Sequence, residues 1–160
     1  MLGAINLNNQ VKIKVISSLE KLYNNESVPS RTLTKFAMLK NEKKSFQVVV
    51  ESENKFNAEL FIKSNFNDIR IYTIEHIKSD FPMNKTGADD YFRFSDDSFY
   101  PDLLLPINED VSINKGINVF WVEINADESL VGNNPIEIFV KNNNNVLIST
   151  NIVIEVIDYK

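Results

Sequence analysis

The chain has 160 residues, the length of one domain, and 43% of them are hydrophobic, which is enough to form a core. Its net charge of −5 argues against nucleic acid as the main partner, because phosphate binding requires an excess of Lys and Arg. It contains 0 Cys, which excludes disulfides and thiolate sites.

The N-terminal segment, MLGAINLNNQ, lacks the basic start and apolar run of a signal peptide. We expect residues 1–10 to be frayed or disordered and a single domain to span residues 11–158. No stretch is apolar over the length that a transmembrane helix requires. An expressed fragment would look the same, so the compartment stays open between cytoplasmic and secreted or cell-surface.

The first half of the chain predicts several strands. Residues 11–15 alternate apolar and basic side chains, the period of a half-buried strand. A second strand is expected within 32–38. The segment 46–50, FQVVV, carries apolar residues on both faces, so it is expected to be a central strand covered on both sides. Two more strands are expected at 58–63 and 68–77.

The middle of the chain is less regular. A helix over 73–79 is a weaker alternative to the strand, since β-branched residues dominate there. Residues 78–99 form the longest irregular segment, and a loop of that length in a compact domain is usually functional or packed against something. A Tyr-Pro-Asp turn is expected at 100–102, followed by an apolar run that Pro106 closes.

The last third predicts strands at 111–113 and 117–125, separated by a turn at Lys115 and Gly116. In the longer strand the core face carries Phe120, Val122 and Ile124, whereas Trp121 lies on the mixed face. Residues 136–141 and 146–156 alternate as a hairpin around the Asn-rich turn 142–145. Regularly spaced strands with little helix predict an all-β, antiparallel two-sheet β-sandwich, Ig-like or jelly-roll-like.

Three stretches, in this order, carry a family resemblance. The first is KNExxSFQVVV, the second is YPDxLLP, and the third is a Trp-Val strand followed by a closing hairpin. Their residues are Lys40, Asn41, Glu42, Ser45, Phe46, Gln47 and 48–50; Tyr100, Pro101, Asp102, Leu104, Leu105 and Pro106; and Trp121, Val122 and 132–157. Together they resemble the N-terminal β-sandwich of glycoside hydrolase family 123 and of domain-of-unknown-function family 4091.

The resemblance covers roughly residues 11–158, with departures in two turns, at Leu103 and at 131–134. In that family the sandwich precedes a (β/α)₈ barrel that carries the hydrolytic carboxylates. The resemblance therefore implies a non-catalytic accessory domain of a larger bacterial protein, with the barrel of the same polypeptide as its partner. No catalytic residue of the family can be placed on this chain, and no cofactor is expected.

Carbohydrate is a second expected partner, because sugars stack on exposed aromatic rings. Tyr91, Phe94, Tyr100 and Trp121 are candidates for such a platform. The alternative is that these rings pack beneath the long loop or against a following domain, where burial would stabilise each by roughly 1.5–3 kcal/mol.

Acidic residues could serve other chemistry. Glycoside hydrolysis needs two carboxyl groups about 5–10 Å apart, and Asp89, Asp90, Asp96, Asp97 and Asp102 could be tried in that role. The first four are also weak calcium candidates, although their spacing fits no EF-hand loop. A solvated surface is the plainer interpretation of such acid pairs, and Asp102 is expected to cap a turn.

The remaining polar candidates have structural interpretations. His76 has no partner pattern for a catalytic triad, and we interpret it as a strand-end residue. Asn41 and Glu42 are expected to organise the corner before the central strand, and Gln47 to be structural. The two functional alternatives to an accessory domain are a stand-alone carbohydrate-binding module and an adhesive sandwich that pairs through edge strands.

Overall fold

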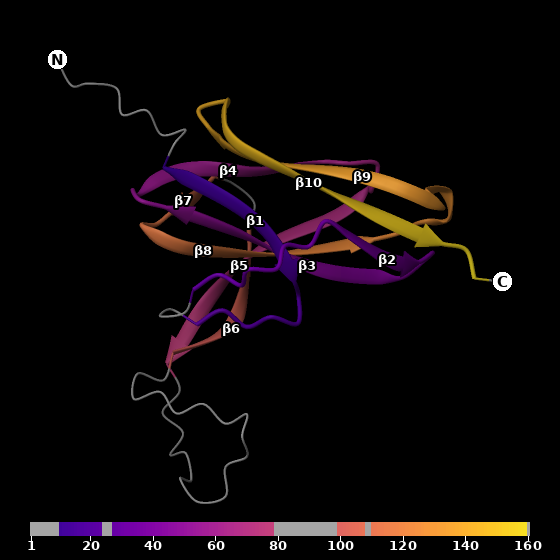
Figure 1. Cartoon of the computed structure of the whole chain (residues 1–160), viewed down its shortest axis with the longest axis horizontal. Coiled ribbons are helices and arrows are strands. Elements are labelled where there is room, and N and C mark those ends of the chain that lie inside the picture. The colour runs from indigo at the N-terminus through magenta and orange to yellow at the C-terminus, as the bar shows by residue number, and fades with distance from the viewer. Residues whose placement is uncertain (1–9, 24–26, 79–98, 108–109, 160) are drawn as a thin grey trace, which may run out of the picture.

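The computed structural model describes residues 10–23, 27–78, 99–107 and 110–159. Within these ranges the chain forms strands β1 to β10 and one 3-10 turn, Glu128–Leu130, with no α-helix. Two sheets pack face to face, so the expected β-sandwich is confirmed (Figure 1). The expected frayed segment 1–10 lies outside the described residues except for Gln10.

Each sheet contains five strands. Sheet A has the order β1 (Val11–Ser17), β3 (Lys43–Ser52), β8 (Gly116–Asn125), β5 (Asp68–Lys78) and β6 (Phe99–Pro106). Sheet B has the order β2 (Lys35–Leu39), β10 (Asn145–Ile157), β9 (Gly132–Asn142), β4 (Phe56–Lys63) and β7 (Val111–Ile113). In Figure 1, β4, β9 and β10 form the upper layer, and β3, β5 and β8 lie below them.

Neighbouring strands pair antiparallel with one departure: β2 runs parallel to β10, with Phe36 opposite Ile154. The chain crosses from sheet A to sheet B between β1 and β2. A strand that arrives by such a crossing is not forced into the antiparallel direction that a hairpin imposes.

The core lies between the inner faces of the two sheets. From β3 it takes Phe46, Val48 and Val50, each 0% exposed. The expected core face of β8 is confirmed, since Phe120, Val122 and Ile124 are all buried there. Sheet B contributes Ile136, Ile138 and Val140 from β9 and Ile152, Ile154 and Val156 from β10.

The closing hairpin was predicted correctly. The strands β9 and β10 pair along their length, with Ile138 opposite Thr150. Asn143 and Asn144 connect them with φ angles of 47° and 66°, the left-handed region that Asn tolerates better than most residues.

Three local predictions need correction. The second strand is Lys35–Leu39 rather than 32–38. Of the segment 73–79 considered as a helix, residues 73–78 belong to strand β5, and residue 79 lies outside the described residues. The Tyr-Pro-Asp stretch is not a turn but lies inside β6. The pairing of β6 with β5 passes from Pro101 directly to Leu103, which leaves Asp102 as the extra residue of a β-bulge.

A core truncation tests this packing. Phe46→Ala should lower the free energy of unfolding by about 3–5 kcal/mol, because the ring is fully buried and its removal leaves a cavity. Urea unfolding measures the change. The matched control is Phe61→Ala, a 38% exposed ring on the outer face of β4, which should cost less than about 1.5 kcal/mol. Equal losses for the two variants would contradict this core.

Candidate functional site

The outer face of sheet A carries a second, smaller apolar cluster. Ile16, Val49 and Val119 come from three adjacent strands, and Leu22 from the segment that connects β1 to β2 covers them. Because Val49 is buried here while its neighbours face the main core, β3 is covered on both faces, as the sequence predicts.

Gln47 holds the covering segment in place. Its side-chain amide donates to the carbonyl of Ser17 at 2.9 Å and to that of Glu20 at 2.7 Å. The residue is 2% exposed, so these bonds satisfy donors that would otherwise be buried without partners. Gln47 therefore has a structural role in this geometry.

Trp121 lies beside Gln47 at the floor of a groove of about 250 Å³. One side of the groove is the covering segment, with Glu20 and Leu22, and the other is β6, with Leu104. The Trp121 indole Nε1–H is buried and donates to no acceptor within the described part of the chain. The groove thus combines apolar side chains, such as Leu22 and Leu104, with charged ones, Glu20, Lys21 and Asp102.

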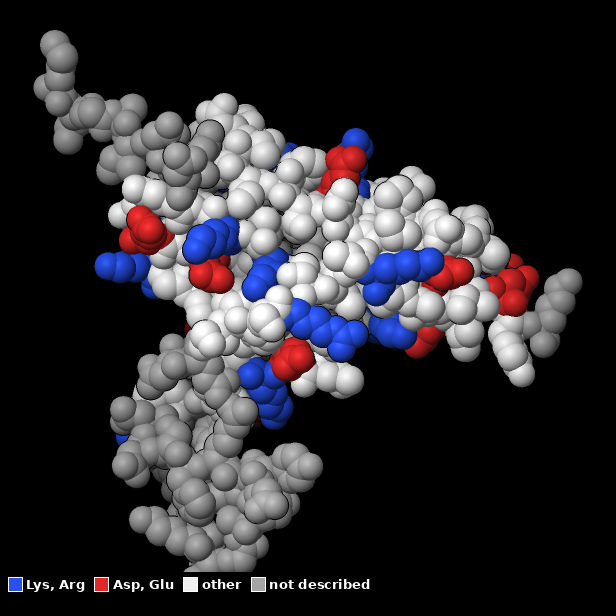
Figure 2. All heavy atoms as spheres, in the orientation of Figure 1, with Lys and Arg blue, Asp and Glu red and all other residues white. Residues whose placement is uncertain are grey.

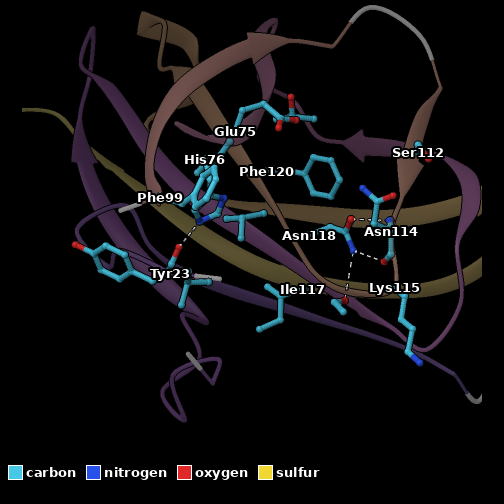
Figure 3. Close-up of a pocket in the computed structure, with 15 residues that line it drawn as sticks. Tyr23, Glu75, His76, Phe99, Ser112, Asn114, Lys115, Ile117, Asn118 and Phe120 are labelled. Atoms are coloured by element: carbon cyan, nitrogen blue, oxygen red, sulfur yellow. Dashed lines mark hydrogen bonds between the residues drawn. The ribbon is translucent and has the colours of Figure 1, made fainter. Parts of the chain in front are cut away.

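A larger cleft of about 450 Å³ opens between β5 and β8 (Figure 3). Its walls carry His76 and Glu75 from β5, Asn114 from the turn into β8, and Asn118 from β8 itself. His76 Nε2 is 3.0 Å from the carbonyl of Leu22, so this nitrogen carries the proton and donates. The bond also ties the covering segment to β5.

The residues predicted from sequence do not all meet at one place. Tyr100 packs edge-on against Tyr23, with ring centroids 6.1 Å apart, whereas Trp121 lines the groove with Pro101 and Asp102. Pro106 ends β6 opposite Tyr72. Tyr91, Phe94, Asp89, Asp90, Asp96 and Asp97 lie outside the described residues, so the aromatic platform and the calcium site stay predictions.

The corner before β3 is built by Asn41 and Glu42. Asn41 has a φ of 61°, and its N–H donates to the carbonyl of Ala126 at 2.7 Å. The Glu42 carboxylate accepts from the N–H of Leu39 at 2.6 Å. The first bond joins the β2–β3 turn to the end of β8 and thereby links the two sheets, and the second closes the turn itself.

Basic and acidic side chains are interspersed on the described part of the face that Figure 2 shows. Several pair across strands, such as Lys35 with Glu155 at 2.7 Å on sheet B. Hydrogen bonds from Ser129 lower the pKa of Asp127, whose carboxylate caps the 3-10 turn. The hydrogen bond and charge of Asp158 raise the pKa of Lys40.

Among the described residues no group of three His, Cys, Asp or Glu side chains could hold a metal ion. Two carboxylates, Glu20 and Asp102, line the groove, but both are exposed and lack the burial that a general acid needs. No helix in the described ranges is long and apolar enough to span a membrane.

Sequence reasoning named His76, Lys115 and Gly116 but missed that they line one cleft with Glu75 and Asn114. Glu75 alternates with apolar neighbours in an ordinary strand pattern, and Asn114 reads as a turn residue. Their proximity depends on where two strands separate, which no local pattern encodes. The apolar run Leu103–Leu105, read as a turn-bounded segment, was the one available signal that β6 is a strand.

No family model matches the sequence, and no curated protein does. Among solved structures, a family 123 glycoside hydrolase from Clostridium perfringens, studied for glycolipid glycan hydrolysis, aligns with 94% of this chain at a TM-score of 0.71 and 12% identity. The chain spans 28% of that hydrolase. At this identity the likeness shows the fold alone.

Two other solved structures align with lower scores. The N-terminal domain of PorA aligns with 91% of this chain at a TM-score of 0.37 and 10% identity, and the chain covers 97% of it. A PapD-like domain of human CEP192 aligns with 89% of this chain at 0.38 and 8% identity, with 98% of that domain covered. Neither bears on function.

The tether by Gln47 can be tested directly. Gln47→Met keeps the length of the side chain but removes both hydrogen bonds, so the free energy of unfolding should fall by about 1–3 kcal/mol. The amide of Glu20, which donates to Ser17, should exchange its hydrogen faster. Asn151→Met, at an exposed position of β10, should change stability by less than about 0.5 kcal/mol. Unchanged exchange at Glu20 would refute the tether.

Proposed function

We propose that this chain is a non-catalytic accessory β-sandwich of a larger glycoside-hydrolase-like protein, and that it packs on a (β/α)₈ catalytic barrel of the same polypeptide. The observation that carries the proposal is the alignment of 94% of the chain with 28% of a family 123 glycoside hydrolase. The KNExxSFQVVV and YPDxLLP stretches point to the same family.

The edge strand β6 supports an interdomain role. Leu103, Leu104 and Leu105 are 41%, 38% and 42% exposed. Because successive side chains of a strand point to opposite faces, both faces of β6 are apolar and open. A strand with two apolar faces is normally covered on both sides, and large exposed apolar patches mark interaction sites.

The ends of β6 indicate how a partner would approach. Pro101 and Pro106 lie within the strand, and proline has no N–H to donate to a further strand. Edge pairing is therefore limited to the four residues between them. We propose that the barrel covers the faces of β6 rather than extending sheet A, and that the adjoining groove at Trp121 belongs to the same contact.

The β6 surface gives a prediction for the isolated chain. Replacing Leu103 and Leu105 together by Ser should lower both self-association and binding of an apolar fluorescent dye, since these side chains are exposed when no partner covers them. Analytical ultracentrifugation and dye titration measure the two effects. The control is Val146→Ser, a 48% exposed apolar residue on β10. If the control lowers dye binding as much as the double variant, β6 is not the exposed patch.

Enzyme assays test the non-catalytic role. Incubated with a panel of p-nitrophenyl glycosides, the isolated chain should release no nitrophenol above the blank, whereas the native polypeptide isolated from its own cells should hydrolyse at least one. Hydrolysis by the isolated chain that is lost in Asp102→Asn would overturn the proposal. It would instead assign catalysis to the groove.

A further inference from the structure

The cleft between β5 and β8 arises because sheet A divides. The two strands pair over Asp68–Thr73 and Phe120–Asn125. Beyond that point β8 continues to Gly116 beside β3, while β5 continues to Lys78 beside β6. The result is a wedge whose closed end is the pair Thr73 and Phe120.

The walls of the wedge are strand edges. Four consecutive residues of β5, 73–76, line it, and so do seven consecutive residues, 114–120, that lead into and along β8. Since side chains alternate between faces, a cavity that touches every residue in a row touches the backbone edge. Beyond the pair Thr73 and Phe120, no strand in the described part of the chain pairs with the facing edges of β5 and β8. Apart from the groups of Asn114 and Gly116 that the Asn118 side chain bonds, the N–H and C=O groups that point into the wedge from alternate residues can meet a ligand.

The side chains around the wedge are mixed in character. Phe99, 41% exposed, offers an aromatic ring beside the polar walls. Glu75 and Lys115 carry opposite charges and have no ion-pair partner among the described residues. The two charges balance, so the site favours a neutral ligand over a phosphate or another anion.

The wall opposite β5 is rigid. The Asn118 side chain accepts from the N–H of Asn114 at 2.8 Å and donates to the carbonyls of Asn114 at 2.9 Å and Gly116 at 3.4 Å (Figure 3). These bonds fix the turn that enters β8. A site built on fixed elements binds without first ordering its own loops.

We propose that this cleft binds a neutral sugar of one or two hexose units. Its volume of about 450 Å³ lies in the range of small-molecule sites. A sugar supplies donors and acceptors around its ring to meet the backbone groups, and a C–H face to meet Phe99. An extended peptide, the other ligand that strand edges bind, is disfavoured because Thr73 and Phe120 close one end of the wedge.

Calorimetric titration of the isolated chain tests the site, with lactose, cellobiose, maltose and chitobiose as probes. At least one disaccharide should bind saturably at one site per chain. Phe99→Ala should weaken that binding by about tenfold, because the sugar loses its ring contact. Glu75→Gln, an exposed and nearly isosteric change, should also weaken it while leaving the fold intact. Phe61→Ala, an aromatic of similar exposure on sheet B, should leave it unchanged.

Several results would overturn the proposal. These are no saturable binding of any of the four disaccharides, binding that survives both Phe99→Ala and Glu75→Gln, and tighter binding of an acetylated Val-Thr-Val-Thr amide than of every sugar. The site does not depend on the accessory-domain proposal. A native protein of 18.4 kDa would end that proposal and leave sugar binding at the cleft as it stands.

Discussion

The burial of β3 on both faces is the constraint on which the rest of this structure depends. Its inner face, with Phe46, Val48 and Val50, meets sheet B, and its outer face, with Val49, requires a cover of its own. That cover is the segment between β1 and β2, held by Gln47. A sandwich normally exposes the outer faces of its sheets to water, so the covered outer face sets this domain apart.

On the other side of sheet A, two neighbouring strands separate from each other. The strand β8 stays paired with β3, whereas β5 leaves it after Thr73 and continues with β6. One consequence is the cleft, whose walls are strand edges. The other is that β6 projects beyond the packed core with apolar side chains on both faces. The cleft and the exposed apolar strand therefore share one structural origin.

The sequence predicted the elements whose signals are local. Alternation of apolar and polar residues identified the hairpin of β9 and β10. Apolar residues on both faces of segment 46–50 identified the doubly covered strand. Each of these patterns can be read within one strand, without knowledge of its neighbours. The prolines of β6 misled the prediction, since Pro101 indicates a turn unless the strand is known to lie at an edge. The cleft could not be predicted, because it depends on where β5 and β8 separate. Trp121 was placed on the correct face and Gln47 was expected to be structural, but the neighbours of both come from distant segments.

The central claim is that these residues serve as one part of a larger protein. The most direct measurement is the size of the native protein in its own cells, by blotting with an antibody raised to this domain. The account predicts a band far above 18.4 kDa, the mass of this chain, in keeping with a sandwich that spans 28% of the hydrolase it resembles. A single band near 18.4 kDa would contradict it, because no barrel would then be present to cover β6.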